Sequence, residues 1–355
     1  MGIIKNRPEN RVPLWFMRQA GRYMAHYRAI KDSAGGDFIK MCKDVQLATE
    51  ITMGPIAAYD FDAAILFSDI LFPLEQLGLG LSYGEGGKGP RLERRITSLA
   101  DVQAMRACQS ASDYYQFQRD AVASIRQKLP AEKDLIGFVG GAWTLFAYAV
   151  HGMGEITAAE ESKLALYDDR FKVFMEKLAP NLLESMLLQV AGGANAVAMF
   201  DTSAGELAYC DYEQFVFPVL ATLFKSFRSE CQCRYQKEVS LIYYMKHATY
   251  GHLDLMKSVM GENDVVGIDW RFPIGRVLRD YGKHFLIQGN IDPSWLLFPW
   301  PKLERALGDY WQEVKLHAGK NLERWVCGLG HGVLKESKEE VVGKAVHYIK
   351  GHYCF

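Results

Sequence analysis

The sequence predicts an α/β fold in which residues 1–355 form one domain, a single (β/α)8 barrel of the TIM type. Three observations favour this fold. Short apolar or β-branched runs recur seven times between amphipathic stretches, as expected for a chain that alternates strands and helices. The runs lack the alternation of half-exposed strands, so they indicate parallel strands buried on both faces. Polar residues follow six of the seven runs, at the strand ends that build the active sites of barrels.

The predicted elements follow one another without a linker, an obvious repeat or a low-complexity tract. Residues 13–17 provide an eighth strand-like element. Helical patterns are clearest at 165–193, where Pro180 implies two helices or one broken helix, and at 336–352. A doubly wound open sheet is the alternative, but the Gly-rich phosphate turn typical of its first strand is missing from the sequence. The seven strand runs are 63–67, 135–140, 196–200, 239–244, 265–269, 284–288 and 324–330.

The composition is that of an ordinary globular protein, with 49% apolar and 23% charged residues. A net charge of −1 argues against general binding to nucleic acid or to membrane surfaces. No apolar run approaches the length of a membrane span, and the first residues have neither an apolar signal core nor the Ser or Thr of a myristoylation pattern. We therefore expect a cytoplasmic protein.

The seven cysteines are scattered along the chain, which is typical of reduced thiols in a cytosolic protein. Cys231 and Cys233 are close enough in sequence to suggest a metal site. No second Cys or His pair stands nearby at zinc-ligand spacing, so we interpret both as plain thiols and expect no bound metal.

The N-terminal region has a strong local excess of positive charge, with seven Lys or Arg and a single acid in the first 31 residues. Within WFMRQAGRYMAHYR (15–28), Arg18 and Arg22 share one face of a helix or bracket a ligand in a loop. An unpaired buried arginine is costly. Either distant acids such as Asp44 and Glu50 cover these arginines, or an anionic ligand, a polycarboxylate or phosphate, supplies the negative charge.

Two acids follow predicted strands directly. Asp69 is either a functional carboxylate between apolar walls or a helix N-cap. Asp201 begins DTSAGE, in which Thr202 and Ser203 are further cap candidates and Glu206 completes a capping-box pattern. A ligand-facing role and a capping role are both open for this segment.

Three other residues have a functional and a structural interpretation. His331 lies between glycines that allow a backbone to approach a ligand, although a lone loop histidine usually has no such role. Tyr148 lies on an apolar segment, where the default is packing with a satisfied hydroxyl. Lys246 is either a buried base or a surface residue with a buried stem.

Seven motifs, in this order, resemble the uroporphyrinogen decarboxylase family, and the resemblance extends from about residue 5 to residue 350. They are MRQAGRY (17–23), FSDIL (67–71), GGAWTL (140–145), FDTSAG (200–205), GIDW (267–270), QGNIDP (288–293) and GLGHG (328–332). The resemblance implies a homodimeric lyase that uses no metal or organic cofactor. Its implied reaction converts the four acetate arms of uroporphyrinogen III to methyls, giving coproporphyrinogen III and CO2 in haem and other tetrapyrrole biosynthesis.

The resemblance also implies roles for single residues. Asp69 would meet the pyrrole N–H groups, and the arginines would bind substrate carboxylates. The implied catalytic residues are Asp69, Arg18, Tyr148 and His331. The implied substrate-binding residues are Arg18, Arg22, Asp69, Tyr148, Thr202 and His331. An arginine, His331 and Tyr148 all stay open as the proton donor.

Two departures and two rival functions bear on these expectations. The family usually has Pro-Glu at Ala25-His26 and Pro at Ala142, so we expect altered rigidity of the basic loop. A barrel methyltransferase needs a zinc held by His and Cys, and no Cys stands two residues after His247. A tetrapyrrole carrier without turnover would have the same arginines and the same Asp69.

Overall fold

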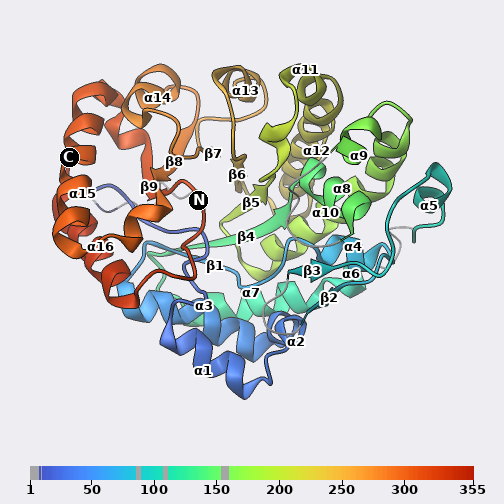
Figure 1. Cartoon of the computed structure of the whole chain (residues 1–355), viewed down its shortest axis with the longest axis horizontal. Helices are drawn as coiled ribbons and strands as arrows, with labels where there is room; N and C mark the ends of the chain where they lie inside the picture. Colours follow the sequence, from blue (N-terminus) through green and yellow to red (C-terminus); the bar gives the residue numbers. More distant parts are fainter. Residues whose placement is uncertain (1–7, 9, 85–88, 107–110, 153–159) are drawn as a thin grey trace.

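A curled sheet of seven parallel strands lies at the centre of the molecule, with helices around it (Figure 1). The computed structural model describes residues 8, 10–84, 89–106, 111–152 and 160–355, so Cys108 and most of the first nine residues lie outside it. Neighbouring strands in the sheet are successive along the chain, which is the arrangement of repeated βαβ units. All seven predicted strands are confirmed. They are β1 (Ala63–Ile65), β4 (Asp134–Gly140), β5 (Ala196–Phe200), β6 (Ser240–Tyr244), β7 (Val265–Gly267), β8 (Leu286–Ile291) and β9 (Trp325–Leu329).

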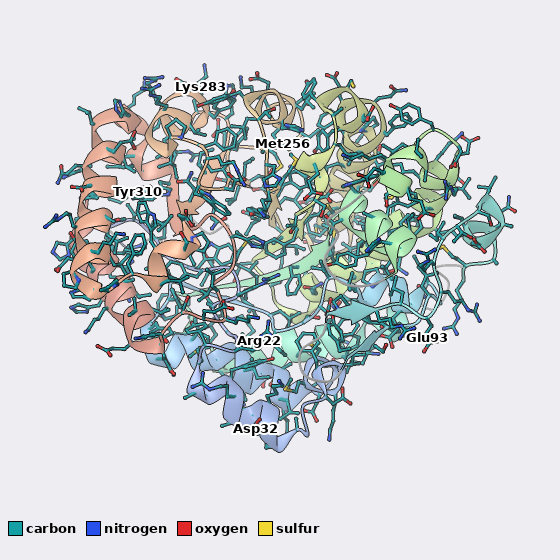
Figure 2. All side chains as sticks on the ribbon, in the orientation of Figure 1. Arg22, Asp32, Glu93, Met256, Lys283 and Tyr310 are labelled. Atoms are coloured by element: carbon teal, nitrogen blue, oxygen red, sulfur yellow. The ribbon has the colours of Figure 1, made fainter. Side chains whose placement is uncertain are left out.

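The strands are buried along nearly their whole length, and all seven positions of β4 are buried. This explains why their sequences show no alternation of apolar and polar residues. Side chains fill the space between the sheet and the helices (Figure 2). A separate antiparallel pair, β2 (Ser82–Tyr83) and β3 (Pro90–Arg91), lies beside the sheet.

The expected eighth element at 13–17 forms one bridge rather than a regular strand. Leu14 makes an isolated parallel bridge with Cys327 of β9, whose N–H donates to Pro13 O at 2.8 Å. On the other side, Asp62 N–H donates to Leu14 O at 3.0 Å, just before β1. The Asp62 side chain takes the Leu14 N–H at 2.7 Å, and proline has no N–H to give, so a longer ladder cannot form here. The segment therefore links β9 to β1 through a few bonds.

The two helices predicted with most detail are confirmed as α10 and α16. The α10 helix is one continuous element of 23 residues with Pro180 inside it, so both the two-helix and the broken-helix alternatives are wrong. No helix among the described residues combines the length and the apolar character needed to cross a bilayer. The helices are α1 (Ala25–Ser33), α2 (Phe38–Lys43), α3 (Val45–Tyr59), α4 (Phe72–Gln76), α5 (Leu99–Gln103), α6 (Ala111–Tyr114), α7 (Gln116–Lys128), α8 (Ala142–His151), α9 (Glu160–Leu164), α10 (Arg170–Gly192), α11 (Tyr209–Asp211), α12 (Phe217–Tyr235), α13 (Tyr250–Met256), α14 (Ile274–Tyr281), α15 (Trp300–Ala318) and α16 (Glu339–His352).

Candidate active site

Buried polar residues anchor the loop that carries the N-terminal arginines. Gln19 is 1% exposed, and its Nε2 donates to Ala63 O at 3.1 Å, at the first residue of β1. The Tyr23 hydroxyl donates to Gln19 O at 2.6 Å. Val333 N–H, after β9, donates to Met17 O at 3.0 Å. The loop is therefore tied to two parts of the barrel, and the residues between the anchors face outward.

Arg18 and Arg22 are the residues that face outward. Both are exposed, and neither side chain forms a hydrogen bond or an ion pair with any residue that the structure describes. Arg22 lies on the sheet side of α1, well away from Asp32 at the other end of that helix (Figure 2). Arg28 differs, because its Nη1 donates to the carbonyls of Arg22 (2.9 Å) and Tyr23 (2.7 Å) and so stabilises the loop backbone. Two of the three guanidinium groups are thus available to a ligand.

The acids that sequence reasoning considered as partners are engaged elsewhere. Asp44 caps α3 by accepting from the N–H groups of its first turn. Glu50 lies 3.9 Å from the Nε2 of His26. The alternative in which these acids neutralise Arg18 or Arg22 is therefore wrong.

The position of Arg18 depends on a glycine after β9. Arg18 has a φ of 56°, an uncommon left-handed conformation for a residue with a side chain. Its stem runs across Gly332, where an added Cβ would lie 2.4 Å from Arg18 Cδ. The glycine of the GHG motif thus leaves room for the stem beside His331.

Asp69 lies in the loop between β1 and α4, where two donors bind its carboxylate. Oδ1 accepts from Leu71 N–H at 2.8 Å, and Oδ2 accepts from the Tyr83 hydroxyl. Leu71, not Asp69, is the N-cap residue of α4, so the capping interpretation of Asp69 is wrong. Desolvation raises the pKa of Asp69, while the two hydrogen bonds and the nearby charge of Arg18 oppose that rise. The residue keeps partial contact with solvent, so a ligand can reach it.

Tyr83 is a functional candidate that sequence reasoning missed. It belongs to the two-residue strand β2, and its ring centroid lies 4.8 Å from that of Phe38. Its sequence, LSYGEGG, shows only the signals of a turn-rich stretch. Tyr148 on α8 lies close enough to interact electrostatically with Tyr83, so the structure brings it toward Asp69.

The surroundings of His331 favour its neutral imidazole form. Its Nδ1 accepts from Gly332 N–H at 2.7 Å, which leaves the ring proton on Nε2. Desolvation lowers the pKa of His331 to about 3, and the positive charges of Arg18 and Lys246 act in the same direction. His331 is therefore a neutral hydrogen-bond donor at neutral pH. Lys246 is half-buried at this rim, with its Nζ 5.9 Å from the ring centroid of Trp270.

The acid of the DTSAGE segment has a structural role. Asp201 is fully buried and accepts from the N–H and hydroxyl of Thr144, at 2.8 and 2.7 Å, so it anchors the N-terminus of α8. An added Cβ at Gly141 would lie 2.2 Å from Asp201 Cβ, which explains the glycine there. Ser203 makes no side-chain cap, so the capping-box expectation is wrong. Thr202 is half-buried beside these residues.

The structure brings some of the expected site residues near Asp69 and not others. Electrostatic interactions join Arg18 to both Asp69 and His331. No hydrogen bond or ion pair among the described residues joins Arg22 or Thr202 to Asp69. The arrangement places one desolvated carboxylate beside an unpaired cation, which suits a ligand with cationic or N–H character at its centre and anionic arms at its edge.

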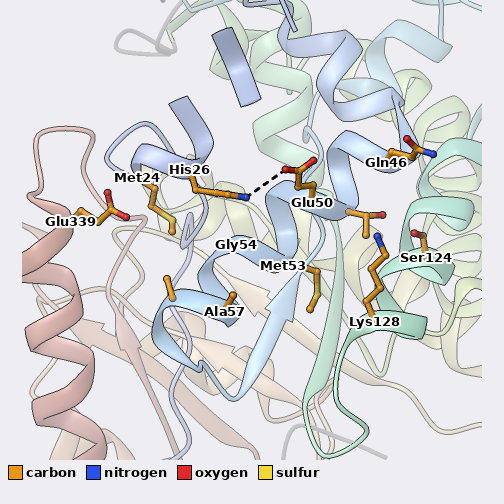
Figure 3. A pocket seen from close by; sticks show the side chains of 12 residues that line it. Met24, His26, Gln46, Glu50, Met53, Gly54, Ala57, Ser124, Lys128 and Glu339 are labelled. Atoms are coloured by element: carbon orange, nitrogen blue, oxygen red, sulfur yellow. Dashed lines mark ion pairs between the residues drawn. The ribbon is translucent and has the colours of Figure 1, made fainter. Parts of the chain in front are cut away.

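A cavity of about 900 Å3 lies elsewhere on the molecule and contains none of the expected site residues. Its walls come from α1, α3, α7 and α16, and His26 points toward Glu50 across it (Figure 3). Among the residues that the structure describes, no group of three or more His, Cys, Asp or Glu is placed to hold a metal. Cys231 on α12 is buried, whereas Cys233 on the same helix is exposed.

Comparisons with known proteins show the family to which the chain is similar. The family model described as "Uroporphyrinogen decarboxylase (URO-D)" matches residues 1–352. A uroporphyrinogen decarboxylase of Roseiflexus sp. is 34% identical and covers 98% of this chain and 97% of its own. The corresponding protein of Pseudomonas syringae pv. tomato is 36% identical, with 98% and 95% covered.

Among solved structures, a methyltransferase from Methanosarcina mazei has a TM-score of 0.71 at 15% identity, covering 99% of this chain and 97% of its own. A B12-independent methionine synthase from Shewanella sp. has a TM-score of 0.53 at 8% identity, with 86% and 85% covered. At such low identity these two structures show a shared fold and nothing about the reaction.

Proposed function

We propose that this chain, which belongs to the uroporphyrinogen decarboxylase family, is a carboxy-lyase that converts uroporphyrinogen III to coproporphyrinogen III. The observation that carries the proposal is the arrangement of Arg18, unpaired by any described acid, within electrostatic range of the desolvated Asp69. A substrate with eight carboxylates supplies the negative charge that the protein does not. The N–H groups of its four pyrroles are donors for Asp69.

Binding uses the two kinds of group differently. Arg18 and Arg22 hold carboxylate arms, because a guanidinium forms strong charge-assisted hydrogen bonds with a carboxylate. Asp69 accepts hydrogen bonds from the pyrrole N–H groups, with lone pairs that Leu71 and Tyr83 leave free. Tyr148, Thr202 and His331 complete the surface that contacts the substrate.

The reaction exchanges CO2 for a proton on each acetate arm. A proton adds to the pyrrole α-carbon next to the arm, which gives a cationic ring. The bond between the arm's methylene and its carboxylate breaks, and the electron pair moves into the ring. A second proton then adds to the methylene carbon, and the ring loses the first proton, leaving a methyl group. The carboxylate of Asp69 stabilises the cationic ring more than the neutral one, which is the differential binding that lowers a barrier.

The pyrrole is its own electron sink, so the chemistry requires no cofactor. The proton donor is a group near the arm, and His331 is one candidate. Desolvation is the main cause of its lowered pKa, and the charges of Arg18 and Lys246 add to it. Substrate carboxylates that pair with these two cations remove only the charge contribution, which raises the pKa of His331 in part. Tyr148 and an arginine are the other proton-donor candidates.

The chain acts as a single-domain homodimer in the cytoplasm. Exposed apolar side chains give such a dimer a contact, since Leu164 is 70% exposed and Tyr167 65% exposed next to α11. Sedimentation at micromolar concentration measures this directly, and a species of about 40 kDa at all concentrations contradicts the dimer.

Anaerobic incubation of the purified protein with uroporphyrinogen III tests the proposed activity. The expected products are coproporphyrinogen III and CO2, formed without any added cofactor. Tight binding of the macrocycle without product indicates a carrier instead and contradicts the proposal.

A further inference from the structure

The Tyr83 hydroxyl is fixed against Asp69 by aromatic packing. The Tyr83 ring packs on Phe38, and Phe38 packs on Phe67, two residues before Asp69, with ring centroids 5.6 Å apart. The β2 strand is thereby tied to the end of β1 through side chains. The hydroxyl then donates to Oδ2 while Leu71 N–H donates to Oδ1 at 2.8 Å. Each carboxylate oxygen thus has one protein donor, which fixes the plane of the group.

The other charged and titratable groups around Asp69 come from separate elements. Arg18 favours the ionised carboxylate, and Glu75 of α4 disfavours it. Glu75 is itself held by Lys43, at 2.8 and 2.9 Å, and by the Tyr114 hydroxyl at 2.6 Å. Cys42 of α2 also lies within electrostatic range of Asp69. Of these neighbours, Tyr83 is the side chain that makes a direct hydrogen bond to the Asp69 carboxylate.

We propose that Tyr83 is a positioning residue for the reaction, whose hydroxyl holds the Asp69 carboxylate ionised and oriented toward the pyrrole N–H groups. This inference rests on the proposed function for its catalytic consequence. A hydrogen bond to the charged form of an acid stabilises that form, and the phenol does so here against the cost of desolvation. The Phe38 packing holds the Tyr83 ring beside the Asp69 carboxylate.

Tyr83→Phe tests the proposal, because it removes the hydroxyl and keeps the packed ring. We expect kcat to fall about tenfold, the effect of one hydrogen bond to a charged group, with KM within about twofold of the wild type. The acid limb of the kcat/KM profile moves to higher pH, because the ionised carboxylate has lost a donor. Tyr114→Phe is the matched control, since it removes a phenol bonded to the neighbouring Glu75, and its acid limb stays in place.

A second readout does not depend on turnover. In protein labelled with 13C at the Asp carboxyl carbons, the Asp69 resonance is assigned by its loss in Asp69→Asn. Tyr83→Phe moves its titration to higher pH, and Tyr114→Phe does not. An unmoved titration and an unmoved acid limb overturn the proposal. A lower KM with constant kcat also overturns the proposal. The Tyr83 hydroxyl would then only compete with substrate for the Asp69 carboxylate. Absence of turnover in the wild type contradicts the proposed function alone, and the carboxyl titration still decides the role of Tyr83.

Discussion

The Arg18 guanidinium lies within electrostatic range of Asp69 and His331 and forms no ion pair with any acid that the structure describes. A protein tolerates such a group at its surface, where water solvates it, and a polyanionic ligand then replaces that water. Arg28, only ten residues later, donates hydrogen bonds to backbone carbonyls. Arginines in one basic segment therefore have two roles: Arg28 stabilises the loop backbone, and Arg18 keeps its donors for a ligand.

Arg18→Ala is expected to raise KM for uroporphyrinogen at least about tenfold, because a hydrogen-bonded charge pair with substrate is lost. The effect on kcat is smaller. Steady-state kinetics at low and high salt measure both, and wild-type KM rises with salt as the pairs are screened. Arg279→Ala is the control, since Arg279 is exposed and pairs with Asp280 next to it. Unchanged kinetics in Arg18→Ala remove this residue from the site.

His331 predicts a pH dependence of stability. Its pKa is lowered from 6.5 to about 3 in the folded protein. Below pH 6.5 the unfolded chain therefore binds a proton that the folded chain does not, and the free energy of unfolding falls as pH drops toward 3. His331→Gln cannot titrate, so its stability falls less between pH 7.5 and pH 5. Urea unfolding of both proteins at the two pH values measures the difference, and equal losses contradict the neutral imidazole.

At the scale of elements, the N-terminus of α1 bears on the first of the two departures from the family pattern, at Ala25-His26. The α1 helix has no acid in its first turn, but Glu339 of α16 supplies one from outside, accepting from Ala25 N–H at 2.8 Å. A proline at this position would have no N–H to donate. The expected loss of a local acid is therefore compensated by a different helix, which the local sequence does not reveal.

A pair of proline substitutions tests this difference. Ala25 and Ala142 each begin a helix after a residue with extended backbone, so proline fits both positions. Ala142→Pro is expected to leave the free energy of unfolding unchanged or raise it by about 0.5 kcal/mol. Ala25→Pro loses the bond to Glu339 and is expected to lower it by about 1 kcal/mol. Denaturant unfolding compares the two variants, and equal effects contradict the role of Glu339.

At the scale of the whole molecule, Asp62 fastens the N-terminal segment to the sheet. Its carboxylate binds the Arg11 guanidinium through both oxygens, at 2.7 Å each, and accepts from Leu14 N–H at 2.7 Å. The three bonds join the segment at residues 11–14, which lies beside β9, to Asp62 just before β1. An Asp at this place therefore contributes to the closure of the fold rather than to the reaction.

Asp62→Ala is expected to lower the free energy of unfolding by about 2–4 kcal/mol, because it leaves a partly buried guanidinium and a backbone N–H unsatisfied. Asp280→Ala, which breaks an exposed pair between adjacent residues, is expected to cost less than about 0.5 kcal/mol. Urea unfolding measures both. Similar stabilities for the two variants contradict the fastening role.

Sequence reasoning found the parts of the molecule that depend on local pattern. The seven strands are continuous buried runs, so their positions follow from composition alone. A strand was expected at 13–17 because the segment is apolar. Pro13 has no N–H to donate, and the Asp62 side chain binds the Leu14 N–H, so only one bridge forms. Asp201 looked like a local cap and instead anchors α8, which lies far away in sequence. Tyr83 was missed because its role arises entirely from β2 packing beside the end of β1.

The central claim is that an ionised, largely desolvated Asp69 near the Arg18 guanidinium drives decarboxylation of an anionic macrocycle. The most direct test is anaerobic turnover of uroporphyrinogen III by the wild type and by Asp69→Asn, which keeps the shape of the side chain and removes its charge. We predict coproporphyrinogen III from the wild type without added cofactor, and a loss of at least about 100-fold in kcat for the variant with little change in KM. Wild-type turnover by Asp69→Asn would contradict the claim.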